Sequence, residues 1–185
     1  MRAAAQLIRR QGVAGTGLRE VVAEAAAPRG SLQHYFPGGK DDLVEEALAW
    51  MGAVAVRRVD REMERMEAGS PSQLLDSLAG YWRRDLRAEG YVGGCPLVAA
   101  AADVVAGNER IRGVLNCSFE TWQTHLASAL STFGVPENRA SALASLVISS
   151  LEGAIVLCRV RHDLGPLDVL VSELGPLLDS AAVSP

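Results

Sequence analysis

Apolar residues recur at helical spacing from the start of the chain. Leu18, Val21, Val22 and Ala25 follow one another at intervals that place them on one face of a helix, and this spacing predicts a short amphipathic helix. Thr16 precedes these residues, and we expect its hydroxyl to cap the free backbone amides of the first turn. The pattern therefore predicts a short helix that begins just after Thr16.

A second short helix is predicted directly after the first. Pro28 follows the run of alanines at 25–27, and a proline cannot continue a helix from within but suits the first turn of a new one. Leu32 and Phe36 are four residues apart, so they share a face that can dock on the preceding helix. The Pro-Gly-Gly sequence at 37–39 then ends this second helix.

Two short helices joined by a tight turn are typical of a helix-turn-helix, whose second helix enters the major groove of DNA. Arg29 can fork onto guanine or clamp a phosphate, and Gln33 can pair with adenine or bond a phosphate. The other outward positions suit close backbone approach, at Gly30, or phosphate contacts that fix the register, at Thr16, Ser31 and Lys40. Singly, each is better explained as an ordinary solvated position, but the whole set favours DNA binding.

Beyond Lys40 the chain is expected to form further helices with short breaks. The apolar spacing predicts a long helix from about Lys40 into the charged segment 57–62, then helices over about 72–88 and 96–105. Three more helices follow, separated by breaks at 107–108, 134–136 and 165–166. We predict an all-α protein of about nine helices. It has an N-terminal three-helix helix-turn-helix domain, residues 1–45, and a C-terminal helical ligand-binding and dimerisation domain, residues 46–185.

Charge is distributed unevenly along the chain. Residues 1–40 carry six basic and two acidic side chains, a net charge of +4, whereas the whole chain carries −4, so residues 41–185 sum to −8. A basic N-terminal part on an acidic body suits a protein that meets DNA at one end. Chance clustering of arginine is the alternative for a difference this small, so the asymmetry counts only together with the motif.

Composition excludes several other classes of protein. No apolar run is expected to reach the length of a transmembrane helix, and no secretory signal is visible, so we expect no membrane partner. The three cysteines, Cys95, Cys117 and Cys158, are few and widely spaced. They predict neither a disulfide framework nor a zinc site, and a reducing cytoplasm fits them best.

The motif residues resemble those of a known family. The segment Ala27–Leu43, APRGSLQHYFPGGKDDL, is similar to the N-terminal domain of the TetR family of bacterial repressors, especially its LmrA/YxaF branch. Beyond about the first fifty residues the resemblance rests on helix order and on the segment 93–97, which is similar to the regulatory domain of that branch. The resemblance implies that the following positions lie at the DNA: Thr16, Arg29, Gly30, Ser31, His34 and Lys40.

Three features depart from the family pattern. Most relatives have a tyrosine where this chain has Gln33, and a glycine where it has Ala26. If the backbone at Ala26 is left-handed, alanine is strained there. The helix expected before Thr16 begins at Met1, whereas the family usually has another turn or more. Either the true start lies upstream or this protein lacks the phosphate contacts of that turn. These departures leave open an alternative, a helical small-molecule-binding protein that has lost specific DNA binding.

The resemblance also implies that the last two helices pair with their copies in a second subunit. The helix expected after the break at 134–136 is apolar on more than one face, and its small residues permit close approach of helices. Packing of both faces within the monomer is the alternative. We expect a homodimer, because a two-fold reader needs two recognition helices about 34 Å apart.

Aromatic residues of the second domain are the candidates for ligand binding. Trp82, Phe119, Trp122 and His125 could line an apolar cavity between helices, although each aromatic alone is better explained as core. The resemblance implies an apolar or aromatic small-molecule inducer.

The combined prediction is a cytoplasmic TetR-type regulator. It is expected to be a repressor that an inducer releases from a palindromic, double-stranded DNA operator. An all-α enzyme is the alternative from another class. The histidines are dispersed, no cysteine has a base nearby in sequence, and no phosphate loop or paired metal-ligand spacing occurs. We therefore predict no catalytic residue, no cofactor and no metal.

Overall fold

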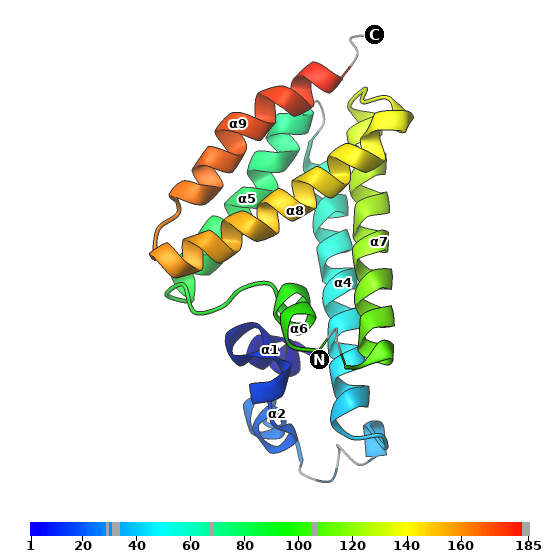
Figure 1. Ribbon diagram of the computed structural model, residues 1–185, viewed down its shortest axis with the longest axis vertical. Coiled ribbons are helices and arrows are strands. Elements are labelled where there is room, and N and C mark those ends of the chain that lie inside the picture. The colour runs from blue at the N-terminus through cyan, green and yellow to red at the C-terminus, as the bar shows by residue number, and fades with distance from the viewer. Residues whose placement is uncertain (29, 31–33, 67–68, 105–106, 183–185) are drawn as a thin grey trace. The chain divides into compact units, whose positions relative to one another are not determined.

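The computed structural model describes residues 1–28, 30, 34–66, 69–104 and 107–182. These residues form eight helices and no strand (Figure 1). The helices are α1 (Arg2–Gly15), α2 (Leu18–Glu24), α4 (Lys40–Arg65), α5 (Pro71–Ala88), α6 (Pro96–Val104), α7 (Glu109–Thr132), α8 (Glu137–Arg161) and α9 (Gly165–Ala181). The predicted all-α class is confirmed. Of the helix predicted after Pro28, only His34 and Tyr35 are described as helical.

The chain divides into two compact units. The first unit consists of Met1–Val54 and Gly93–Phe119. Within it, α1 packs against α2 and α6 (Figure 1). Its core contains fully buried apolar side chains from four helices, namely Ile8, Leu48, Leu97 and Ile111.

The second unit consists of Ala55–Val92 and Glu120–Pro185. Here α5, α8 and α9 lie side by side, each packed on the other two (Figure 1). Leucine and isoleucine side chains dominate its core, among them Leu74, Leu75, Leu86, Leu126, Leu130, Leu151, Ile155 and Leu167.

These units differ from the division expected at residue 45. The first unit extends along α4 to Val54, and it also takes in α6 and the first turns of α7. The segment 93–119 therefore belongs with the N-terminal helices rather than with the C-terminal ones. The division into residues 1–45 and 46–185 remains a proposal about function.

Local signals place the helix ends where the sequence predicts them. The α5 helix begins with a capping box, in which the Gln73 amide donates to the Ser70 hydroxyl and the Ser70 amide donates to the Gln73 side chain. Pro71 occupies the first turn, where a missing amide proton costs nothing. The α6 and α9 helices likewise begin at or next to a proline, at Pro96 and Pro166.

The α8 helix is more apolar than the sequence analysis allows. A stretch of 18 residues within it has a mean hydropathy of 1.9. By length and composition alone α8 could therefore cross a membrane, so the expectation that no run reaches that length is wrong. Half of that stretch is buried inside the protein, and core helices of soluble proteins meet the same criterion.

Candidate DNA interface and its support

Thr16 does not cap α2 as predicted. The N-cap residue of α2 is Gly17, and no side chain caps this helix. The Thr16 hydroxyl instead donates to the carbonyl of Gly12 at 2.7 Å, and the residue is only 3% exposed. The α1 helix is kinked at Gly12, so the Thr16 amide bonds Val13 and leaves the Gly12 carbonyl to the hydroxyl. The phosphate contact expected of Thr16 stays a prediction.

The turn after α2 has the left-handed residue that the family departure suggested. Ala26 has a φ of +49°. Its amide donates to the carbonyl of Ala23, and the Ala27 amide donates to the carbonyl of Val22, which is the Schellman arrangement that normally carries glycine. Alanine is strained in this conformation because its Cβ crowds the following carbonyl.

The central part of the predicted recognition helix lies outside the described residues. This applies to Arg29, Ser31 and Gln33, so their contacts with DNA remain predictions. Gly30 and His34 are described, and both are exposed. The His34 ring meets the neighbouring Tyr35 edge-on, with ring centroids 5.0 Å apart.

Tyr35 is a candidate contact that the sequence analysis missed. It is 69% exposed, and its phenol group can donate to a phosphate or stack on a sugar. The signal was present in the sequence, because a helix that turns Phe36 inward places Tyr35 about 100° away from it.

Lys40 opens α4, as the sequence predicts. Its ammonium group donates to the carbonyl of Ala14 at 3.2 Å. That carbonyl lies in the last turn of α1, where the partial negative charge of the helix end favours a cation. Lys40 therefore joins α4 to α1 at the surface, and its phosphate contact stays a prediction.

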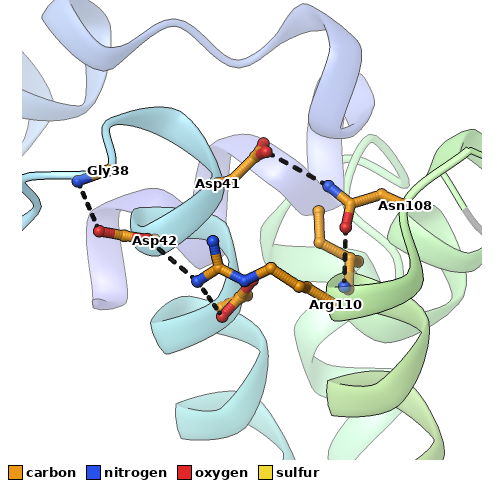
Figure 2. Close-up of polar contacts among 7 residues, drawn as sticks. Gly38, Asp41, Asp42, Asn108 and Arg110 are labelled. Atoms are coloured by element: carbon orange, nitrogen blue, oxygen red, sulfur yellow. Dashed lines mark hydrogen bonds and ion pairs between the residues drawn. The ribbon is translucent and has the colours of Figure 1, made fainter.

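The start of α4 is held by the first turn of α7, as Figure 2 shows. Arg110 of α7 donates to the Asp42 carboxylate at 3.1 Å and pairs with Glu45 at 2.8 Å. Hydrogen bonding to Asp42 and the charge of Glu45 raise the pKa of the Arg110 guanidinium. Asn108 reaches the neighbouring Asp41 at 3.4 Å. One arginine and one amide thus connect α7 to the first turns of α4.

This connection continues into the Pro-Gly-Gly turn. Asp42 accepts the amide proton of Gly38 at 2.7 Å (Figure 2). Asn108 accepts the Ile111 amide at 3.1 Å and so caps α7. A surface hollow of about 300 Å³ opens beside these groups, lined by Tyr35, Phe36, Asp42, Glu45, Glu46, Ala49, Arg110 and Val114. The turn that follows the recognition segment is therefore fixed to α7 as well as to α4.

A carboxylate of α6 supports the kink in α1. Asp103 accepts the Ala14 amide at 3.2 Å. A Cβ added to Gly12 would lie 2.2 Å from the same carboxylate, and Gly12 has a φ of +74°. Glycine is required here twice over, for its backbone conformation and for the close approach of Asp103.

Comparison with known proteins decides the family. Residues 1–47 match the family of bacterial regulatory proteins called tetR, and residues 71–173 match the C-terminal domain of LmrA/YxaF-like transcriptional regulators. This chain belongs to the TetR family. The family and the branch that the sequence resembles are both confirmed. As a TetR-family member it is a DNA-binding transcriptional regulator and not an enzyme.

Relatives of this TetR-family chain cover it almost completely. An uncharacterized HTH-type transcriptional regulator of Mycobacterium tuberculosis is 38% identical, over 95% of this chain and 90% of the relative. The regulator LmrA of Bacillus subtilis is 28% identical, over 95% of this chain and 93% of LmrA. The crystal structure of regulatory protein TetR from Rhodobacter sphaeroides has a TM-score of 0.81 at 22% identity, over 95% and 94% of the two chains. The structural likeness confirms the TetR fold.

The four candidate ligand residues of this TetR-family chain occupy different environments. Trp82 and Trp122 are buried, whereas Phe119 and His125 are partly exposed. Phe119 ends a segment of the first unit, and the other three belong to the second. The Nδ1 atom of His125 lies 2.9 Å from the carbonyl of Thr121 on its own helix. The role of all four in ligand binding remains a prediction.

Proposed function

We propose that this TetR-family regulator is a cytoplasmic repressor. In this proposal two copies form a homodimer, bind a palindromic operator, and leave it when an apolar or aromatic small molecule binds. The observation that carries the proposal is an uncovered apolar stripe on α8 and α9. It supplies the two-fold contact that a reader of palindromic DNA needs.

Large apolar side chains of α8 are exposed in the single chain. They are Leu146, Val156, Leu157 and Val160, and α9 adds Val169 and Leu177. The α8 residues recur at helical spacing, and no atom lies within 4 Å of the position that a Cβ on Gly153 would take. Exposed apolar surface of this kind marks an interaction site. A second copy of α8 and α9 would cover it.

The DNA contacts in this proposal come from the first unit. They are Thr16, Arg29, Gly30, Ser31, Gln33, His34 and Lys40. The net charge of +4 on residues 1–40 would attract the phosphate backbone. A repressor acts on the chromosome, which is why we place it in the cytoplasm.

The inducer site in this proposal involves Trp82, Phe119, Trp122 and His125. Their rings offer apolar surface, and His125 adds a polar group that could orient a ligand. An inducer can release DNA only if it binds the DNA-incompetent arrangement more tightly than the competent one. The α4 helix belongs in part to each unit, so we expect a shift of α4 to transmit ligand binding to the DNA-binding residues.

Fluorescence anisotropy tests the DNA-binding part of the proposal. The labelled duplex is taken from directly upstream of the chain's own gene, and a scrambled duplex serves as competitor. If no preference is seen, selection from randomised duplexes replaces the upstream DNA. Tight, competitor-resistant binding by two subunits supports the repressor, whereas failure to select any sequence supports the alternative that specific DNA binding is lost. Apolar aromatic compounds are then added to the complex to look for release.

The variant Arg29→Ala sharpens this test. If Arg29 reads a base, the loss of its hydrogen bonds should weaken specific binding by about 2 kcal/mol. The matched control is Arg112→Ala, which removes an exposed arginine of α7 that pairs with Glu109. Equal affinity of the Arg29 variant and the control would remove Arg29 from the DNA interface.

A further inference from the structure

A charged side chain is buried in the first unit. Arg9 of α1 is only 6% exposed. Its Nε atom donates to the carbonyl of Gly94 at 3.0 Å, and the Gly94 amide donates to the carbonyl of Arg9 at 3.2 Å. Burying a guanidinium group is costly unless its hydrogen bonds are made. The two reciprocal bonds tie α1 to a backbone segment that lies 85 residues further along the chain.

The segment held by Arg9 has no room for a larger residue. A Cβ added to Gly93 would lie 2.7 Å from the Nε atom of Arg9. Gly93 and Gly94 begin the Gly-Gly-Cys-Pro-Leu sequence that resembles the regulatory domain of the family branch. The lack of a side chain at Gly93 is explained by the arginine that packs on it.

The two residues before Gly93 are anchored on α8 instead. The Val92 carbonyl accepts a hydrogen bond from Nη2 of Arg159 at 3.0 Å. The Tyr91 ring packs on the His162 ring, with centroids 5.5 Å apart. Tyr91 and His162 both have left-handed backbones, with φ of +64° and +53°. Such conformations are strained for residues with a Cβ and persist only where their surroundings hold them.

The segment 91–94, here called the strap, therefore has two separate anchors. The second unit ends one of its segments at Val92, and the first unit resumes at Gly93. Tyr91 and Val92 are held by α8 within the second unit, and Gly93 and Gly94 are held by Arg9 within the first. Only one peptide bond separates the two anchors.

We propose that Arg9 is a positioning residue for DNA binding, acting through the strap. A change at the last turn of α8 reaches α1 along the strap, because Arg9 prevents Gly93 and Gly94 from sliding on α1. The strap thereby links the helix that carries the apolar dimer stripe to the unit that carries the DNA-binding residues. This inference rests on the proposed function, because it assigns a route of coupling to that regulator.

A double-mutant cycle on the full chain tests the strap. Arg9→Met and Arg159→Met each weaken one anchor by removing its side-chain hydrogen bond to the strap, and affinity is measured for the duplex found above. We expect each single variant to bind the duplex about tenfold more weakly than the unaltered chain. The double variant should bind no more weakly than the single variant with the lower affinity. Residues that share no contact normally give additive effects, so additive losses would overturn the proposal.

Two controls separate positioning from other roles of Arg9. Arg83→Met removes ion pairs to Asp76 and Asp168 in the second unit. It should leave DNA affinity within about twofold and combine additively with Arg9→Met. The dependence of affinity on salt should be the same for Arg9→Met and the unaltered chain. If the slope of log affinity against log salt concentration is smaller by about one for Arg9→Met, Arg9 neutralises a phosphate directly, and the proposal is overturned.

A second variant covers the case in which Arg9→Met does not fold. Tyr91→Gly keeps Arg9 and relieves the left-handed backbone, but it frees the strap from His162. It should bind the duplex several-fold more weakly without a lower unfolding temperature, and unchanged affinity would count against the strap.

Amide hydrogen exchange tests the strap independently of DNA binding. If the unaltered chain selects no duplex, the proposed function fails and the strap is judged alone. Arg159→Met should then speed amide exchange in α1, at Ala14 and its neighbours, although Arg159 belongs to the other unit. Unchanged exchange in α1 would overturn the strap whatever the DNA result.

Discussion

The two units, each taken by itself, illustrate different kinds of interaction. In the first unit, single polar contacts fix helix ends and turns, such as Asp103 on Ala14, Lys40 on Ala14 and Arg110 on Asp42. In the second unit, α5, α8 and α9 pack over a core of leucine and isoleucine side chains. Polar contacts are directional and each contributes about 1 kcal/mol, whereas apolar packing is non-directional and large in sum. We therefore expect the loss of one polar contact to disturb a helix end or turn of the first unit, and the loss of buried volume to lower the stability of the second unit as a whole.

The largest expected effect concerns the uncovered stripe of the second unit. Val160→Glu would place an uncompensated carboxylate in the proposed dimer contact of each subunit, which costs several kcal/mol. We expect a monomer by size-exclusion chromatography with light scattering. Val160→Thr adds no charge and should remain dimeric. A dimeric Val160→Glu variant would move the subunit contact away from this stripe.

The next effect breaks the core of the second unit. Leu126 is almost completely buried, and Leu126→Ala should lower the free energy of unfolding by about 3 kcal/mol because it leaves a cavity. Urea denaturation measures this loss. Leu126→Met keeps the volume and should cost less than about 1.5 kcal/mol. If the two variants lose the same stability, packing is not what holds this unit.

A smaller effect on stability is expected at the turn after α2 in the first unit. Ala26→Gly removes the strain of a left-handed alanine and should raise the free energy of unfolding by about 1 kcal/mol. The adjacent Ala25 has a right-handed backbone with a φ of −79°, so Ala25→Gly should destabilise the protein. Thermal unfolding distinguishes the two, and a stabilising Ala25→Gly would contradict this explanation.

The smallest effect tests the exposed connection of α7 to α4. Arg110→Ala removes the pairs with Asp42 and Glu45. We expect a slight fall in DNA affinity that disappears at high salt, because surface ion pairs are weak and screened. The control Arg112→Ala also removes an α7 ion pair but touches neither α4 residue. If the two variants have the same DNA affinity at every salt concentration, the Arg110 connection plays no part in DNA binding.

The parts of the fold that were predictable depend on local signals. The start of α5 follows from Ser70, Pro71 and Gln73, which are neighbours in sequence. The starts of α6 and α9 likewise follow from Pro96 and Pro166. Such features are set by a few adjacent residues, so a single sequence reveals them.

The parts that sequence reasoning missed depend on distant partners. Thr16 is an ordinary capping residue until the kink at Gly12 offers its hydroxyl another acceptor. Arg9 looks like one surface cation among several, and its burial depends on Gly94. Asp103 gives no local sign that it will meet Ala14, 89 residues away. The packing of α1 on α6 and on the segment before it brings Arg9 to Gly94 and Asp103 to Ala14.

The apolar stripe of α8 has a consequence for biosynthesis. Ribosomes make chains from the N-terminus, so α8 and α9 emerge after every other helix described for this protein. Apolar surface that waits uncovered on a new chain promotes aggregation. The order of synthesis therefore shortens the time for which this apolar stripe is exposed before the subunits assemble.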